Sequence, residues 1–260
     1  MAPIGIIGGS GLYELLDDPQ RETVETPYGT PSAPVSLGTI GGVEVAFITR
    51  HGTDHAVPPH LINYRANLKA LAQLGVQTLI TSSVVGSLRA DYAPGHFVLT
   101  DQYVDRTWGR ADTFFTGPQV VHVSLAEPYC PRLRDVARAA LTRLEETFHP
   151  TGTSVVIQGP RFSTRAESQW FQKMGWDVLS MTQHPETALA RELEMCVANV
   201  SFVSDLDAGV PGVQDEPVTA GLVWRTVAEA QPRIKAALAE TVANVPDLSD
   251  CACRRALADI

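Results

Sequence analysis

The sequence has little cysteine and no long apolar run. Its 260 residues include only four cysteines, Cys130, Cys196, Cys251 and Cys253, which are too few and too unevenly spaced for the disulfide framework of a secreted protein. No stretch of eighteen apolar residues occurs, and a glycine loop at Gly8 interrupts the amino terminus before a signal-peptide core could form. We therefore predict a soluble, cytoplasmic protein in a reducing compartment, with no membrane partner.

Basic residues are also in deficit. Twenty lysines and arginines stand against 29 aspartates and glutamates, which gives a formal net charge of −9. Such a chain offers no broad cationic surface, which argues against nucleic acid and anionic membranes as partners. Any anion that the protein binds must therefore be held by a local site.

Hydrophobic residues make up 44% of the chain, enough for a well-buried core. Apolar runs typical of strands alternate with helical periodicity, which predicts an α/β fold: a single domain with a central mixed β-sheet flanked by helices. We expect strands at residues 4–8, 43–49, 78–84, 153–157, 177–180 and 197–204, helices near 61–71, 136–144, 185–196 and 218–242 with a break or kink at Pro232, and long loops at 17–34 and 107–118. We assign residues 1–244 to this domain and 245–260, with the Cys-Ala-Cys pair, to a C-terminal tail.

Three of the expected strands end in groups that suit phosphate. The first runs into a glycine turn around Ser10, where backbone amides and a hydroxyl can converge on an anion. The second ends at Arg50 and His51, a planar cationic fork and a directed donor, and the third ends in hydroxyls that include Ser83. Each has an ordinary alternative: a tight turn, a surface arginine with a capping histidine, a polar turn. Because ligands gather at the carboxyl ends of such strands, their recurrence predicts a phosphate site.

Two loops at later strand ends could contact a purine nucleoside. Phe162 and Ser163 follow the strand at 153–157, and an aromatic ring there could stack on a base, although Phe162 could equally fill the core. Met181 and Thr182 follow the strand at 177–180. A thioether could pack on a sugar and a hydroxyl could reach phosphate, although Thr182 could instead cap the next helix.

The most informative carboxylates are Asp205 and Asp207, which close an apolar strand. A carboxyl group that is partly removed from water has a raised pKa, so it can hold a proton at neutral pH and donate it to a leaving group. The alternative is an ordinary aspartate-rich turn. We predict no metal in the functional site, because the histidines at 51, 55 and 60 lack the helix and the glutamate of a zinc protease motif.

Ten motifs occur in the order in which they occur in one enzyme family: IGIIGGSG, TPYG, RHG, NYRANL, VGSL, DQYVDRT, HVSLAEPYCP, GPRFSTRAES, MT and SDLDAG. Over residues 4–242 the chain thus resembles the 5′-methylthioadenosine phosphorylases of the purine nucleoside phosphorylase family. The resemblance implies a pentosyltransferase of purine and methionine salvage. Phosphate would attack the ribosyl carbon of methylthioadenosine and give adenine and 5-methylthioribose 1-phosphate, with inorganic phosphate as co-substrate and no metal or organic cofactor.

The resemblance also implies roles for single residues. The phosphate-binding residues would be Ser10, Arg50, His51, Ser83, Val84 and Thr182, and the substrate-binding residues would be Phe162, Ser163, Met181, Asp205, Asp207 and His122. Asp205 and Asp207 would be catalytic, with Asp205 protonating the leaving purine and accepting from its 6-amino group. His122 resembles a residue that members of the family lend to a neighbouring subunit, which implies a homo-oligomer, a trimer.

Three points stay open. Ala220, Val223 and Trp224 would give the 5′-substituent an apolar pocket, but this helix aligns with the family only after a short deletion. A relative that acts on 6-oxopurine nucleosides or on 5′-methylthioinosine is the alternative enzyme, although Asp205 argues against it. The cluster of phosphate donors argues against a hydrolytic nucleosidase, which a phosphate requirement would distinguish, and Arg50 with both aspartates argues against a non-catalytic nucleoside-binding protein. The tail cysteines resemble those of some family members and could form a small disulfide loop or stay reduced.

Overall fold

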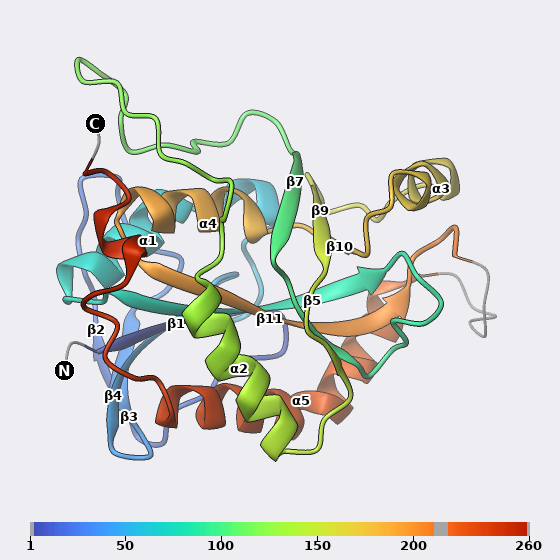
Figure 1. Ribbon diagram of the computed structural model, residues 1–260, viewed down its shortest axis with the longest axis horizontal. Coiled ribbons are helices and arrows are strands. Elements are labelled where there is room, and N and C mark those ends of the chain that lie inside the picture. The colour runs from blue at the N-terminus through green and yellow to red at the C-terminus, as the bar shows by residue number, and fades with distance from the viewer. Residues whose placement is uncertain (1–2, 211–217, 259–260) are drawn as a thin grey trace.

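One mixed sheet runs through the middle of the molecule (Figure 1). The computed structural model describes residues 3–210 and 218–258, within which eleven strands form this sheet. They are β1 (Ile4–Gly8), β2 (Gln20–Glu22), β3 (Val35–Ile40), β4 (Val43–Thr49), β5 (Thr78–Ser87), β6 (Phe97–Leu99), β7 (Gln102–Arg106), β8 (Phe148–His149), β9 (Thr153–Ile157), β10 (Val178–Ser180) and β11 (Cys196–Leu206). The order is β2-β3-β4-β1-β5-β10-β9-β7; β11 pairs with β5 and β6, and β6 also pairs with β8.

Parallel pairing at the centre of the sheet brings several strand ends together. β1 runs parallel to β4 and β5, and β5 runs parallel to β11. Gly8 pairs with Thr49, so the glycine turn and the Arg50 segment begin side by side. Because parallel strands end at the same edge of a sheet, the segments that follow β1, β4 and β11 meet at the edge where ligands of α/β sheets bind.

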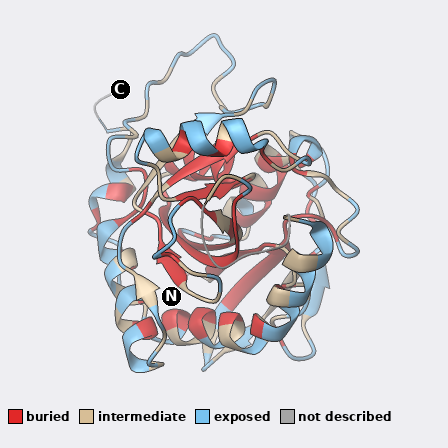
Figure 2. Ribbon diagram, turned by 90° about the vertical axis from the view of Figure 1, so that its right-hand side faces the viewer, coloured by how far each residue is buried: buried red, intermediate tan, exposed pale blue. Residues whose placement is uncertain are grey.

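Helices cover both faces of the sheet (Figure 1). α1 (Tyr64–Gln73) and α4 (Gln183–Glu192) pack on one face, and α2 (Pro131–Arg143) and α5 (Ala220–Ala243) pack on the other. The pleat of β1 divides the two cores, because Ile4 and Ile6 point toward α2 and α5 whereas Ile7 points toward α1 and α4. Figure 2 shows that the helices turn their exposed faces outward around a buried centre.

A smaller core lies beside α3 (Arg165–Lys173), where Phe171 packs with residues of β9 and β10. The helix starts at a capping box, in which the Thr164 side chain accepts from the backbone N–H of Glu167 and the Glu167 side chain accepts from that of Thr164. This cap fixes the end of the loop that carries Phe162.

The predicted α/β fold with a mixed sheet is confirmed. The strands expected at 4–8, 43–49 and 153–157 have those bounds. Those expected at 78–84 and 197–204 are parts of the longer β5 and β11, and the one expected at 177–180 is β10, one residue shorter. The prediction lacks β2, β3, β6, β7 and β8, because short or partly exposed strands carry no long apolar run. The loop expected at 107–118 contains no helix or strand.

α5 continues through Pro232, so the break expected there is not found. Pro232 is exposed, and the carbonyl group four residues earlier belongs to the exposed Ala228, where water can supply the hydrogen bond that proline cannot. Beyond α5, residues 245–258 return to the sheet, and Leu248, Cys251 and Cys253 join the core under α2 and α5. No helix of the described chain combines the length and the apolar character that crossing a bilayer requires.

Replacing Leu238 by alanine tests the packing of α5 on the sheet. Leu238 is completely buried, so we expect the free energy of unfolding to fall by about 2–5 kcal/mol in chemical denaturation. The control is Glu229→Ala on the exposed side of the same helix, which should change it by less than about 0.5 kcal/mol. Equal stability of the two variants would contradict this packing.

Candidate active site

The carboxyl ends of the central strands enclose a cavity of about 280 Å³. Most of the predicted site residues line it, namely Ser10, Arg50, His51, Ser83, Val84, Phe162, Met181, Thr182, Asp205 and Asp207. The remaining lining comes mainly from the glycine turn, from the loop after β4, from the segments around β10 and from α5. Residues that are far apart in the sequence therefore meet in one concave site, as expected for a small-molecule pocket.

A bulge near the end of β11 turns consecutive polar residues into the cavity. The register between β5 and β11 shifts between Val203 and Asp205, which leaves Ser204 as an extra residue in β11. Ser204, Asp205 and Asp207 all line the cavity, whereas consecutive residues of a regular strand face opposite sides. The bulge therefore aims Asp205, as bulges beside active sites commonly do.

Asp205 sits in surroundings that favour its neutral form. The residue is 4% exposed, and burial raises the pKa of Asp205 to about 6, against the hydrogen bond from Ser204 Oγ (2.6 Å) and with added repulsion from Asp207. Gly86 leaves room for this carboxyl group, because a Cβ atom there would lie 3.2 Å from Asp205 Oδ1. A group with this pKa can hold a proton near neutral pH and give it to a ligand.

Asp207 is held by a neighbouring hydroxyl. Ser163 Oγ lies 2.7 Å and 2.6 Å from the two carboxylate oxygens of Asp207. Both residues are buried, but Asp207 lines the cavity and Ser163 does not. Ser163 therefore orients Asp207 from behind.

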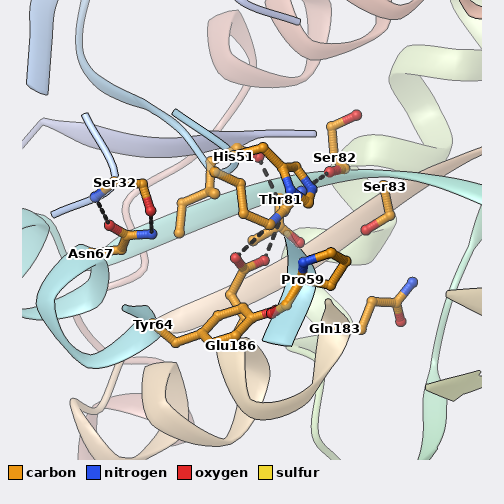
Figure 3. Close-up of polar contacts among 12 residues, drawn as sticks. Ser32, His51, Pro59, Tyr64, Asn67, Thr81, Ser82, Ser83, Gln183 and Glu186 are labelled. Carbon is orange, nitrogen blue, oxygen red and sulfur yellow. Dashed lines mark hydrogen bonds and ion pairs between the residues drawn. The ribbon is translucent and has the colours of Figure 1, made fainter. Parts of the chain in front are cut away.

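The buried guanidinium of Arg50 is mostly occupied by partners inside the chain. Nε and Nη2 donate to the two carboxylate oxygens of Glu186 (2.7 and 2.8 Å), and Nη1 donates to the carbonyl oxygen of Ser82 (2.8 Å; Figure 3). Nη2 also donates to the carbonyl oxygen of Ile7 (3.4 Å). Of the five N–H donors, one on Nη1 is left for a ligand. Because Glu186 balances the charge of Arg50, the cavity gains a directed donor here more than a net positive charge.

His51 presents an acceptor to the cavity. Its Nδ1 lies 2.9 Å from the carbonyl oxygen of Val57, which can only accept, so Nδ1 carries the proton. Burial and the neighbouring Arg50 charge lower the pKa of His51 to about 3, which keeps the ring neutral and leaves a lone pair on Nε2. This differs from the donor expected from the sequence. A neutral Nε2 suits the P–OH group of a protonated phosphate.

Beneath the cavity, an amide side chain orients the hydroxyl of Ser83. Asn199 of β11 is completely buried, and its Nδ2 donates to Thr81 Oγ1 (2.8 Å) and to Ser83 Oγ (2.9 Å). Its Oδ1 accepts from Gln183 Nε2 (3.2 Å) and from Ser201 Oγ (2.6 Å). Because Ser83 Oγ accepts from Asn199, the proton of Ser83 is free to point into the cavity.

A second arginine holds the segment that carries Met181. Arg110 donates from Nη1 to the carbonyl oxygens of Met181 (2.9 Å) and His184 (2.6 Å), and from Nη2 to that of Gln158 (2.9 Å). These bonds tie the loop after β9 to the loop after β10. Thr182 is the N-cap residue of α4 but makes no side-chain cap bond, so its hydroxyl is not used there.

One wall of the cavity is aromatic and apolar. Ala220, Val223 and Trp224 reach it from α5, and the rings of His55 and Trp224 meet edge to face with centroids 4.8 Å apart. The hydroxyl of Tyr13 lies 3.1 Å from His55 Nδ1. The wall gives an apolar substituent a place away from the polar strand ends.

Known proteins match this chain over nearly its whole length. Residues 3–243 match the family model of the phosphorylase superfamily. The chain belongs to that superfamily. It is 50% identical over 256 residues to S-methyl-5′-thioadenosine phosphorylase of Thermofilum pendens, which covers 98% of this chain and 96% of that protein. It is 47% identical over 266 residues to purine nucleoside phosphorylase of Streptomyces coelicolor, with 98% and 94% covered.

A solved structure agrees with these relatives. Methylthioadenosine phosphorylase from Schistosoma mansoni in complex with adenine superposes on this phosphorylase with a TM-score of 0.95 and 33% sequence identity. The superposition covers 100% of this chain and 98% of the other. The architecture of the superfamily is thus shared from end to end.

Two predicted site residues of this phosphorylase do not line the cavity. Ser163 stands behind Asp207, and His122 is exposed in the segment before α2. The structure also adds residues that the sequence did not predict, Glu186, Asn199, Arg110 and His55. The only local signal for Glu186 is an acidic residue in the first turn of α4, and nothing near Asn199 or Arg110 indicates what each will contact.

The variant Asn199→Asp tests the orientation of Ser83. The aspartate carboxylate has the same shape but can only accept hydrogen bonds. Ser83 would therefore turn its hydroxyl proton toward residue 199, and that proton would no longer be available to phosphate. Since a hydrogen bond to a charged group contributes about 1.5–3 kcal/mol, we expect KM for phosphate to rise about tenfold or more, with a much smaller change in KM for the nucleoside.

The matched control is Thr100→Val, which removes a hydroxyl that donates to Asn199 Oδ1 (3.4 Å) on the side away from Ser83. Steady-state kinetics with phosphate varied at saturating nucleoside should leave this control near the parent value. A parallel rise of both KM values in Asn199→Asp would show a general loss of structure and contradict the orienting role.

Proposed function

We propose that this phosphorylase cleaves 5′-methylthioadenosine with inorganic phosphate, giving adenine and 5-methylthioribose 1-phosphate. The observation that carries the proposal is the composition of one cavity, which joins hydroxyl and N–H donors to a buried carboxyl group of raised pKa and to an apolar wall. Its S-methyl-5′-thioadenosine phosphorylase relatives support the same reaction. We propose no metal or organic cofactor for this pentosyl transfer.

Phosphate would lie among Ser10, Ser83, Thr182 and the free N–H of Arg50, with its P–OH group toward His51. As the bond to the purine lengthens, the ribosyl carbon gains positive charge, and the phosphate anion below it stabilises that charge. Preorganised hydroxyls and a charge-balanced guanidinium fix the position of the anion without neutralising it. The anion therefore remains both a nucleophile and an electrostatic partner for the transition state.

Asp205 would act at the purine. In its neutral form the carboxyl group donates through its O–H to N7 and accepts through its C=O from the 6-amino group. Closure of the cavity by the purine removes water from Asp205, which raises its pKa further and favours this form. A 6-oxopurine would instead place its O6 acceptor against the C=O acceptor of Asp205, and the two would repel each other. Asp205 therefore favours adenine. Phe162 would pack on the base and Met181 on the sugar.

The apolar wall supports a methylthio group at the 5′ position. Val223 and Trp224 offer apolar surface to a thioether, and burial of each methylene-sized group contributes about 0.8 kcal/mol. The 5′-hydroxyl of adenosine would lose its water there unless it met His55. We infer a preference for methylthioadenosine over adenosine.

We further propose a cytoplasmic homo-oligomer, a trimer. His122 is exposed and does not line the cavity of its own chain, so a role in substrate binding requires that it reach a neighbouring subunit. Dilution tests this assembly. Specific activity should fall at the protein concentrations at which sedimentation shows the oligomer dissociating.

Adenine release from methylthioadenosine, with and without phosphate, tests the reaction itself. We expect strict dependence on phosphate and formation of a sugar 1-phosphate, both followed by chromatography. The second candidate function is that of a purine nucleoside phosphorylase, like the Streptomyces coelicolor relative. It is tested by parallel assays with methylthioinosine, inosine and adenosine as substrates. Turnover without phosphate would indicate a hydrolase, and a preference for inosine would favour that second candidate.

The variant Asp205→Asn tests the specificity and the proton. We expect kcat/KM for methylthioadenosine to fall and its ratio over methylthioinosine to drop about tenfold or more, because an amide can donate as well as accept at the 6 position. Since the neutral carboxyl group is the active form, kcat/KM of the parent should decline as pH rises through and above about 6. The variant should lose this decline.

Phosphate itself ionises in the same pH range, but it does so in both proteins, so the difference between the two profiles isolates Asp205. An unchanged substrate ratio together with an unchanged pH profile in Asp205→Asn would remove Asp205 from the reaction.

A further inference from the structure

All four cysteines of the chain meet at one place in the core. Cys130 is the N-cap residue of α2, Cys196 is the first residue of β11, and Cys251 and Cys253 lie at the start of η2 (Ala252–Arg255) and within it. All four are buried, and their sulfur atoms lie within 4.8 Å of one another. Three separate segments of the chain therefore bring four soft ligands to one point.

The spacing of the sulfur atoms suits a tetrahedral metal ion. In a zinc tetrathiolate with Zn–S bonds of about 2.3 Å, the sulfur atoms are about 3.8 Å apart. The Sγ atoms of Cys130 and Cys251 are 3.7 Å apart, whereas a disulfide bond would require about 2.0 Å. Small shifts of the four side chains would thus let them enclose an ion. Cysteine would then fill all four coordination positions, and none would remain for water or substrate.

A buried positive charge accompanies the cluster. Four thiolates and one Zn²⁺ carry a net charge of −2, which is costly in an apolar core unless a cation is near. The Arg191 side chain is buried, and its Nε and Nη1 have no hydrogen-bond partner among the described residues. Arg191 is also close enough to Cys253 for its charge to act on that sulfur. A buried guanidinium with unused donors near Cys253 suits an anionic cluster there.

We propose that Cys130, Cys196, Cys251 and Cys253 form a structural zinc site. The site joins residues 245–258, which lie beyond the segment that matches the family model, to the starts of α2 and β11. It lies at the opposite end of β11 from Asp205, about 30 Å away along the strand. With all four positions filled by cysteine, the ion takes no part in phosphorolysis and acts through stability alone.

Zinc content tests the site directly. The full-length protein, produced with zinc in the medium and purified under reducing conditions, should hold one zinc ion per chain, and Cys253→Ser should lose most of it. The matched control is Leu248→Ala, which removes a buried side chain from the same core without removing a ligand, so zinc should stay. Loss of zinc should lower the melting temperature and leave KM for phosphate and nucleoside unchanged.

Cobalt keeps the test independent of how well the variant folds. Replacement of zinc by Co²⁺ in the parent protein should give the intense visible bands of a tetrahedral cobalt thiolate. Three results would each overturn the proposal: a metal-free parent protein with four free thiols, a non-reducing peptide map with Cys–Cys pairs, or equal zinc in the parent and in Cys253→Ser, which would mean adventitious zinc elsewhere. None of these results bears on phosphate-dependent turnover, so the proposed reaction is tested separately.

Discussion

The parallel pairing of β5 with β11 is the constraint on which the site depends. Ser83 lines the cavity at one level of this pair, and three residues farther along β5, about 10 Å away, Gly86 lies beside Asp205. In the proposed reaction, that separation leaves room for the sugar between phosphate and the purine. Because both strands are almost wholly buried, a slip by one residue would turn every side chain to the wrong face, so the spacing of the two ends is as rigid as the core itself.

Polar groups are concentrated under the cavity because the site is built into the core instead of on surface loops. Arg50 bonds to Glu186, and Asn199 bonds to nearby hydroxyl groups. These hydrogen bonds leave few buried polar atoms without a partner in this part of the described chain. Removing one partner of the Arg50–Glu186 pair is costly, since the remaining charge stays buried, so this pair stabilises the fold as well as shaping the cavity. The same low-dielectric surroundings raise the pKa of Asp205 to about 6 and lower that of His51 to about 3, so His51 stays neutral near neutral pH and Asp205 keeps a proton up to about pH 6.

A site residue could be predicted from the sequence where its role depends on its immediate neighbours, and not where it depends on a distant contact. The strand ends at Ser10, Arg50 and Ser83 could be predicted because chemistry and position lie in the same few residues. Glu186 could not, because its role depends on contact with an arginine 136 positions away, and the acceptor role of His51 depends on the Val57 carbonyl group. The uneven spacing of the four cysteines argues against a secreted disulfide framework, but only the fold shows that the four sulfurs converge.

β11 links these observations. All eleven of its residues are buried, so its position is set by contacts along both faces and at both ends. At the carboxyl end the bulge at Ser204 and the bond from Ser163 to Asp207 set the position of the acids. At the amino end Cys196 lies among the other three sulfurs. A tie at that end would add to the stability of the strand, while the position of Asp205 is fixed separately at the other end by the bulge and by the close-packed core around it.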